Sequence, residues 1–400
     1  MNCNSNHSLF LRSNGDLACW DDYGSLRVLQ SFDPMLDYAN LYLEGIYEDI
    51  RQRLRAGEMP WPEHCARCMC LMHQSQMDDG HYARTRIVET FQIEPSMGCQ
   101  LACPGCISPN ERKGRVSRTT FGHMTLKQEV LEKIIVDLRH ARIKVNKFDF
   151  QGHGEPTLNK SLWEMIRFAS VLYPKSVISL CTHANLDFDM AMVHSGVNEV
   201  LFAVDGADQA TYAPYRVHGN FDRAWNFMRE FSLTAARERA NIERVWKYVV
   251  FDHNDSPEAL LRAQELALEA KITEMRFVRT QLGPMSSQVI EESDIPKLSP
   301  NLNVTFVAYR IQEAQLRAAI TDLSQALEQS QPRRAEVAAL FFRNMLIRLF
   351  RTAGKIPESH LQLIREAQPL IGLLSQDEQT KFDSVVTRLA QGVFPGNALS

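Results

Sequence analysis

Three cysteines in one short stretch constrain this chain more than any other feature of its sequence. Cys99, Cys103 and Cys106 have the spacing Cys-x3-Cys-x2-Cys and follow an apolar run from Ile87 to Ile93 that predicts a strand. This spacing can place three thiolates on one face of a metal cluster. Four thiolates fill an ordinary 4Fe–4S cluster, so three leave one iron open to a small ligand. A structural zinc site or plain reduced cysteines are the alternatives.

The bulk composition limits the compartment and the partners. A length of 400 residues predicts two or three domains, and a net charge of −4 gives no case for nucleic acid. No apolar run approaches the length of a bilayer span, and the first residues do not form a signal peptide. We therefore expect a cytoplasmic protein without a membrane span, in which clustered cysteines indicate metal rather than disulfides.

The N-terminal segment, residues 1–85, carries a second group of thiols. Residues 10–20 predict a strand, a glycine turn and a returning strand, and Leu41–Ala56 predicts a helix. The segment ends in Cys-x2-Cys-x-Cys, and its cysteines are Cys3, Cys19, Cys65, Cys68 and Cys70. The same spacing allows a small zinc ribbon.

The central segment, residues 86–300, alternates apolar runs with amphipathic helices, which predicts βα units and a parallel sheet. The expected strands are Arg86–Glu94, Val145–Gln151, Ser176–Cys181, Glu199–Val204, Arg244–Phe251 and Thr273–Arg279. The expected helices are Leu126–His140, Ser161–Tyr173, Asp187–His194, Phe221–Ala240 and Pro257–Ala270. Functional residues of such units stand at the carboxyl ends of the strands.

The second and third strand ends carry candidate ligand-binding residues. The second is followed by Gly152-His-Gly154-Glu155-Pro, in which glycines let a ligand approach the backbone and Glu155 can accept hydrogen bonds from an ammonium group. A tight turn explains the same residues. The third ends in Cys181, Thr182 and His183, where a buried thiol and a satisfied structural histidine are the alternatives.

The fourth and fifth strand ends add charged and amide side chains. Asp205 and Arg216 follow the fourth strand, and the Arg216 guanidinium can pair with a carboxylate bidentately or form a surface ion pair. Phe251-Asp-His-Asn254-Asp255 follows the fifth strand, where Asn254 and Asp255 can also act as turn and N-cap residues.

In this order, these motifs resemble those of the radical S-adenosylmethionine (SAM) enzymes. The resemblance implies a partial (β/α)6 TIM-like barrel with SAM at the open iron of the Cys99–Cys103–Cys106 cluster. It also implies reduction of SAM to a 5′-deoxyadenosyl radical by electrons from a flavodoxin- or ferredoxin-type donor. The residues that it implies for SAM binding are Gly152, Gly154, Glu155, Thr182, His183, Asp205, Arg216 and Asn254. His183 and Ala203 depart from the asparagine and serine usual in the family.

The N-terminal cysteines resemble those of the SPASM and twitch modules that hold auxiliary 4Fe–4S clusters. The resemblance implies Cys3, Cys19, Cys65 and Cys68 as ligands, with Cys70 a spare or a replacement. Here the module precedes the barrel, whereas in most relatives it follows it.

Residues 301–400 read as wholly helical, over Ala314–Ser330, Arg334–Thr352, Glu358–Gln368 and Gln376–Gln391. The basic and apolar stretch from Phe341 to Arg351 can face a membrane or a partner helix, but a small helical bundle is the expected setting.

The resemblance around Phe251–Asp255 favours a carbohydrate or related natural-product substrate. Its radical can be epimerised, with Cys70 or Cys181 as hydrogen donor, or dehydrogenated through an auxiliary cluster. The alternatives are a maturase that modifies a ribosomally made peptide, with the C-terminal helices gripping a leader, and a non-catalytic iron–sulfur protein.

Overall fold

The computed structural model describes residues 3–19, 27–66, 68, 85–104, 106, 125–280, 285–308, 313–353 and 358–391. Its contacts divide the chain into two units. The first comprises Met1–Cys3, Ile50–Asp79 and Ala308–Ser400, and the second comprises Asn4–Asp49 and Gly80–Val307. The second unit contains the candidate site, so it is described first.

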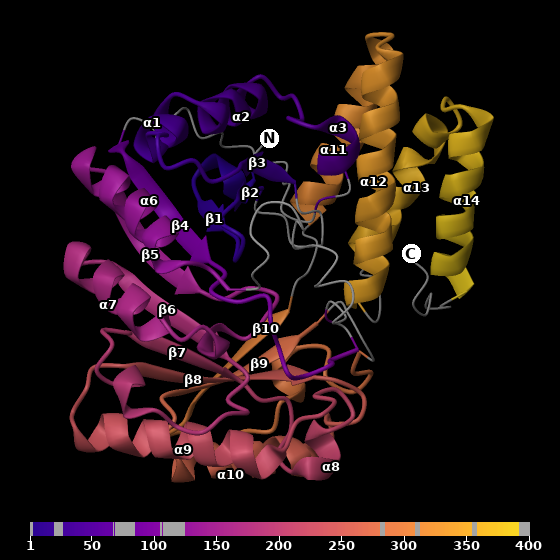
Figure 1. Cartoon of the computed structure of the whole chain (residues 1–400). Coiled ribbons are helices and arrows are strands. Elements are labelled where there is room, and N and C mark those ends of the chain that lie inside the picture. The colour runs from indigo at the N-terminus through magenta and orange to yellow at the C-terminus, as the bar shows by residue number, and fades with distance from the viewer. Residues whose placement is uncertain are drawn as a thin grey trace. The chain divides into compact units, whose positions relative to one another are not determined.

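The second unit is built on one sheet with the strand order β10-β9-β8-β7-β6-β5-β4-β1-β2-β3 (Figure 1). From β4 to β9 neighbouring strands are parallel and follow one another along the chain. Their bounds are β4 Ile87–Ile93, β5 Lys144–Phe150, β6 Val177–Thr182, β7 Glu199–Ala203, β8 Glu243–Val250 and β9 Glu274–Arg279. All six predicted strands are thus confirmed, and the unpredicted β10, Asn303–Ala308, extends the sheet beyond β9.

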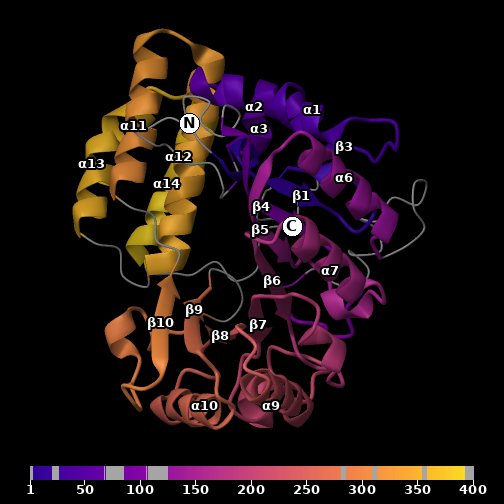
Figure 2. The same ribbon diagram turned by 90° about the vertical axis from the view of Figure 1, so that its left-hand side faces the viewer.

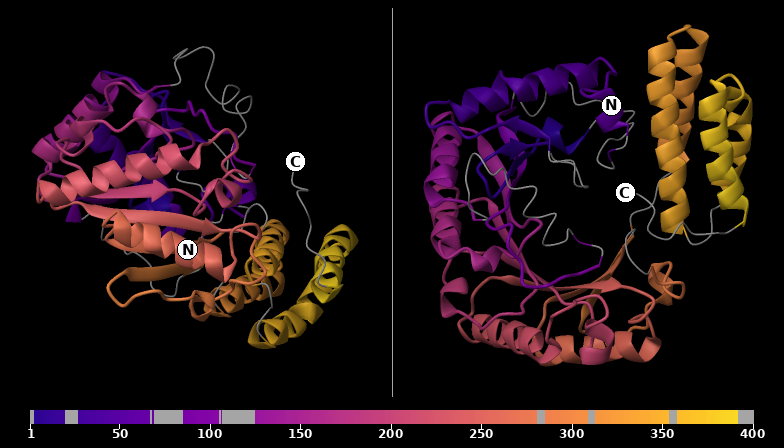
Figure 3. Two further views of the ribbon diagram at one scale, coloured as in Figure 1. Left: turned by 90° about the horizontal axis from the view of Figure 1, so that it is seen from below. Right: turned by 45° about the vertical axis from the view of Figure 1, so that its right-hand side comes forward.

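Helices cover one face of this curved sheet, as the views of Figure 3 show. They are α6 Gln128–His140, α7 Leu162–Leu172, α9 Phe221–Arg237 and α10 Pro257–Glu269, with the short η2 Pro156–Leu158, η3 Met190–Met192, α8 Gln209–Tyr212 and η4 Glu292–Asp294 between or after them. Large apolar side chains fill the layer beneath them. The Phe148 ring lies 5.2 Å from that of Tyr173, and the Phe202 ring lies 5.5 Å from that of Phe231. These βα units form the partial barrel that the sequence predicts.

The opposite face of the sheet, called the polar face here, carries charged side chains among apolar ones. These side chains alternate along each strand with those that face the helices. Near the amino-terminal ends of the strands, Glu199 accepts hydrogen bonds from Lys147 at 2.8 Å and from Ser179 at 2.6 Å. Arg276 pairs with Glu274 through two nitrogens, at 2.7 and 2.9 Å. Within each of these two pairs, the opposite charges therefore neutralise each other.

The N-terminal residues depart from the predicted division of the chain. The strands β1 Leu9–Leu11, β2 Leu17–Ala18 and β3 Val28–Gln30 follow the short η1 Asn4–Asn6 and belong to the barrel sheet, with β1 parallel to β4. Residues 1–85 are therefore divided between the two units rather than forming one module. The reason is backbone pairing: β1 is an apolar strand that continues the ladder of β4.

Two predicted helices differ from those observed. The expected helix Leu41–Ala56 is two helices, α1 Tyr38–Leu43 and α2 Ile46–Arg55. They part at Gly45, where a Cβ atom would lie 2.9 Å from the Leu41 carbonyl oxygen. Of the expected helix Asp187–His194, only η3 forms.

The first unit contains α3 Pro62–Cys65 and the helices α11 Glu313–Glu328, α12 Pro332–Ala353, α13 Glu358–Ile371 and α14 Gln376–Gln391, labelled in Figure 2. The four long helices match the predicted ones closely. Phe341 and Phe342 are buried, and the Phe342 ring lies 5.6 Å from that of Phe382. Phe341 and Phe342 thus pack within the helical bundle, as expected for this part of the stretch. Among the described residues, no helix is both long and apolar enough to cross a membrane.

Candidate functional site

The cysteine loop leaves the carboxyl end of β4 and touches the loops that follow the next three strands. Gln100 donates to the Asn185 carbonyl at 3.2 Å, and Ala102 N–H donates to the Val217 carbonyl at 3.1 Å. The Cys106 sulfur lies 3.9 Å from the His153 carbonyl oxygen. A turn joins Cys106 N–H to the Cys103 carbonyl at 3.0 Å. Four strand ends therefore converge on this loop, as the sequence order predicts.

The loop after β5 packs against the backbone that leads into Cys99. Glu155 N–H donates to the Gly98 carbonyl at 2.7 Å. A Cβ atom on Gly154 would lie 2.3 Å from the Ser96 carbonyl oxygen, and one on Gly152 would lie 2.3 Å from Cγ of Glu94. These glycines are thus required by the close approach of the chain to itself, which is the role of a tight packing turn.

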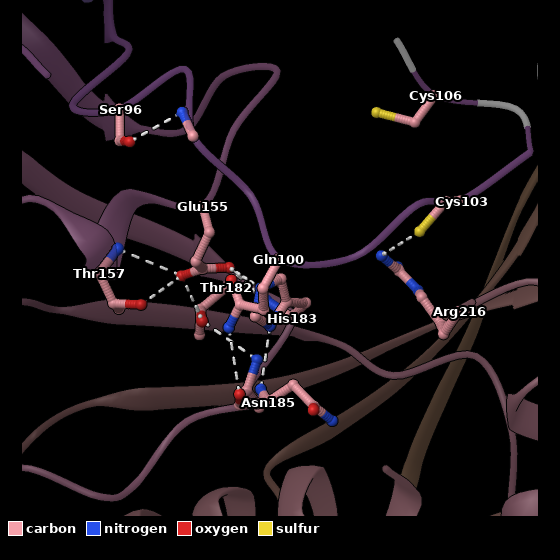
Figure 4. A network of polar contacts seen from close by, with 12 residues as sticks. Ser96, Gln100, Cys103, Cys106, Glu155, Thr157, Thr182, His183, Asn185 and Arg216 are labelled. Atoms are coloured by element: carbon pink, nitrogen blue, oxygen red, sulfur yellow. Dashed lines mark hydrogen bonds and ion pairs between the residues drawn. The ribbon is translucent and has the colours of Figure 1, made fainter. Parts of the chain in front are cut away.

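The Glu155 carboxylate is buried and satisfied by protein donors (Figure 4). Its Oε1 accepts from the hydroxyls of Thr182 and Thr157, both at 2.7 Å, and from Thr157 N–H at 3.2 Å. Its Oε2 accepts from His183 N–H at 2.9 Å. Glu155 therefore ties the loop after β5 to the end of β6, a contact that the sequence did not reveal.

His183 is a buried, neutral histidine. Its Nδ1 accepts from Asn185 N–H at 2.9 Å, so the ring proton belongs on Nε2, which lies 3.3 Å from Oε2 of Glu155. Burial lowers the pKa of His183, and the nearby Glu155 charge only partly offsets that effect. The residue has the environment of a structural histidine.

Asp205 and Arg216 form a buried ion pair beside the cysteine loop. Arg216 Nε donates to Asp205 at 2.6 Å, and its Nη1 lies 3.8 Å from the sulfur of Cys103. Burial raises the pKa of the Cys103 thiol, and Arg216 opposes that shift. Burial alone would lower the pKa of Arg216, but Asp205 and Cys103 hold it well above its ordinary value. Arg216 thus supplies positive charge where thiolates would gather.

Asn254 serves the backbone around β8. Its amide donates to the carbonyls of Asp205 and Val249, both at 3.0 Å, and its oxygen accepts from Phe251 N–H at 2.7 Å. Asp255 accepts from the Ser286 hydroxyl at 2.6 Å. Both side chains are buried and hold turns, in agreement with the simpler of the two sequence interpretations.

The other predicted cysteines fall in different parts of the chain. Cys181 lies on the polar face of β6, and burial raises its pKa. Cys3, Cys65 and Cys68 belong to the first unit, whereas Cys19 follows β2 in the second. Cys70 lies outside the described residues. Within the described ranges, no three Cys, His, Asp or Glu side chains gather closely enough to hold a single metal ion.

The sequence alone does not reveal the role of Glu94, which directly follows β4 and is fully buried. Its Oε1 accepts from His153 N–H at 2.9 Å, and its Oε2 accepts from the backbone and hydroxyl of Ser13, at 3.2 and 3.1 Å. It joins the β1–β2 turn to the glycine loop beside the cysteines. The available signal was an acidic residue at the end of an apolar strand, directly before the cysteine motif.

Comparisons with known proteins support an iron–sulfur site in this region. Residues 95–221 match the family described as "4Fe-4S single cluster domain". This segment includes Cys99, Cys103 and Cys106, the three cysteines that the sequence predicts to hold a 4Fe–4S cluster. No curated protein sequence matches the chain.

Solved structures with a similar chain path include SuiB of Streptococcus suis bound to the precursor peptide SuiA, with 14% identity, a TM-score of 0.39 and coverage of 76% of this chain and 72% of that one. For SuiB bound to S-adenosylmethionine, the identity is 14% and the TM-score is 0.38, and the match covers 83% of this chain and 71% of that one. A third is the radical S-adenosylmethionine methyltransferase TsrM of Kitasatospora setae, with cobalamin and a 4Fe–4S cluster bound. Its identity is 15% and its TM-score is 0.34, and the match covers 53% of this chain and 41% of that one.

Proposed function

We propose that this chain is a radical SAM enzyme. The observation that carries the proposal is the position of the three-cysteine loop: it leaves the end of β4 and contacts the loops after β5, β6 and β7. Ligands of parallel α/β folds bind at the carboxyl ends of the strands, where this loop lies. The matched 4Fe–4S family covers the same segment.

Cys99, Cys103 and Cys106 would hold the cluster. A four-iron cluster is larger than a single ion and keeps its thiolates farther apart, which suits thiols spread along a loop. Three ligands would leave one iron open to SAM, and a cluster bound there would supply one-electron reduction chemistry. Arg216 beside Cys103 offsets the negative charge of the thiolates. The electron donor that we propose is a flavodoxin or ferredoxin.

Arg216 and Glu155 are the residues that we propose for the amino acid end of SAM. Arg216 is only 14% exposed and keeps one nitrogen on Asp205, so its guanidinium is oriented before a carboxylate arrives. Glu155 already accepts four hydrogen bonds from protein groups. Glu155 would therefore contact SAM with the same carboxylate that holds Thr182 and His183 in place.

The first test is SAM cleavage. With dithionite, the anaerobically reconstituted protein should convert SAM into 5′-deoxyadenosine and methionine. Glu155→Ala should weaken SAM binding by about tenfold or more, because it removes the carboxylate and leaves the buried donors of Thr182 and His183 unsatisfied, at about 1–3 kcal/mol for a buried donor. Glu155→Gln, which keeps the shape, separates loss of charge from loss of packing. Unchanged SAM affinity in both variants would show that the site is misplaced.

For the substrate we propose a carbohydrate or related natural product. This proposal rests on the sequence resemblance around Phe251–Asp255. The contacts of Asn254 and Asp255 do not add to it, because both side chains make hydrogen bonds within the protein. Epimerisation and dehydrogenation both begin with hydrogen abstraction from such a substrate, and they differ in whether a thiol returns a hydrogen atom.

Comparison of Cys70→Ala with Cys181→Ala tests hydrogen return. For an epimerase, one variant should still form 5′-deoxyadenosine while product formation falls, because the substrate radical is not quenched. Iron content, measured in each variant, should stay at the wild-type level. Full turnover by both variants would exclude a spare thiol as donor and favour oxidation through an auxiliary cluster.

A further inference from the structure

One cation on the polar face of the sheet differs from the others. Lys147 pairs with Glu199 at 2.8 Å, and Arg276 pairs with Glu274 at 2.7 Å. Lys247, on β8, makes no side-chain hydrogen bond or ion pair with any of the residues that the structure describes. It is the third cation on this face, and it is half-buried.

The neighbours of Lys247 in the sheet offer it no negative charge. In the sheet register it lies between Ala203 of β7 and Arg276 of β9. Like charges on neighbouring strands repel, and Arg276 is already committed to both oxygens of Glu274. Ala203 is too small to cover the ammonium group. A lysine in this setting is available to pair with an anion that is not part of the chain.

Lys247 also lies on the side of the sheet where the candidate site is. It stands three residues before the end of β8, and Cys181 stands one residue before the end of β6. Both side chains belong to the same face, because Cys181 pairs with Leu201 and Lys247 pairs with Ala203, two residues farther along β7. Lys247 and Arg216 each oppose the rise in the Cys181 pKa that burial causes, so both charges act on that thiol.

We propose that Lys247 binds an anionic oxygen group, a carboxylate or a phosphate, of the substrate and holds it beside Cys181. The identification of the ligand as a substrate rests on the proposed function, whereas the binding of an anion by Lys247 does not. Asp149, on the same face, does not compete for Lys247: it is buried and accepts from Gln151. Lys147 and Arg276 are held in ion pairs with glutamates of the same face. Among the residues that the structure describes on this face, Lys247 is therefore the cation that can take an external anion.

Alkylation of Cys181 tests this without knowledge of the substrate. The anaerobically reconstituted full chain is treated separately with iodoacetate, an anion, and iodoacetamide, its neutral analogue, and modification of Cys181 is followed by peptide mass spectrometry. The ratio of the iodoacetate rate to the iodoacetamide rate should fall about tenfold in Lys247→Met, since a positive charge on the same face of the sheet concentrates an anionic reagent. Lys247→Arg should keep the wild-type ratio.

Lys147→Met is the matched control, because it removes an equal charge from the same face at a residue already paired with Glu199. Its ratio should equal that of the wild type. Acetate and inorganic phosphate are then added separately as competitors to the wild-type protein. The anion that slows modification by iodoacetate more is the one that Lys247 favours.

Three results would overturn the proposal. They are an unchanged ratio in Lys247→Met, an equal loss in Lys147→Met, and failure of Cys181 to react with either reagent, which would mean that no ligand reaches this face. Formation of 5′-deoxyadenosine is measured in parallel. If the protein does not cleave SAM but the ratio still depends on Lys247, the proposed function fails while the anion site stands.

Discussion

Replacing Cys99, Cys103 and Cys106 together with alanine should abolish cleavage of SAM and remove about half of the bound iron. The unmodified chain should hold roughly eight irons and eight sulfides, four in the cluster of the cysteine loop and four in an auxiliary cluster. The auxiliary ligands that we propose are Cys3, Cys19, Cys65 and Cys68. Iron, sulfide and zinc are measured after anaerobic reconstitution.

The control for this prediction is Cys181→Ala, which removes a thiol near the site but no proposed ligand. It should retain the full iron content. About four irons in the unmodified protein, or one equivalent of zinc, would rule out the auxiliary cluster. Full iron content in the triple variant would refute the assignment of the cysteine loop itself.

Gly154→Ala should disrupt the same loop without touching a cysteine. The new Cβ atom would lie 2.3 Å from the Ser96 carbonyl oxygen and 2.5 Å from that of Gly98. Both contacts are with backbone, so residues 96–98 would have to move, and with them the start of the cysteine motif. Overpacking of this kind costs about 1–3 kcal/mol, and we expect a lower Tm together with incomplete iron incorporation.

Gly98→Ala is the matched control, since it lies beside Cys99 and its Cβ atom would lie 3.3 Å from the Ser96 hydroxyl oxygen and 3.6 Å from Leu158. Those are side-chain contacts that can adjust, so iron content and Tm should stay near the wild-type values. Equal losses in the two variants would mean that the loop tolerates no change at all, and the specific role of Gly154 would be wrong.

The strands and long helices could be predicted from the sequence because they are locally encoded. The six barrel strands are apolar runs separated by amphipathic helices, and their predicted bounds fall within a few residues of those observed. The hairpin of residues 10–20 was also predicted, but its attachment to β4 was not. Pairing between β1 and β4 joins residues about 80 positions apart (Phe10 with Gln92), which local periodicity cannot reveal.

The candidate site was predicted as a set of strand ends, and the structure brings those ends together. What the sequence could not provide was the direction of each carboxylate and amide. Glu155 and Asn254 have the right chemistry for a ligand, yet each is satisfied by neighbouring protein groups. The same polar residue types hold turns and bind ligands, and only tertiary contacts distinguish the two roles.

The double attachment of Glu94 limits how far the chain can be shortened. A protein that began at residue 27 would lack β1, β2 and both Ser13 donors to Glu94. β4 would then become an edge strand, with unpaired backbone groups open to intermolecular pairing. Because Glu94 also binds His153 of the glycine loop, trimming the N-terminus would loosen the cysteine loop from a distance. Aggregation and poor cluster loading would then follow from one deletion.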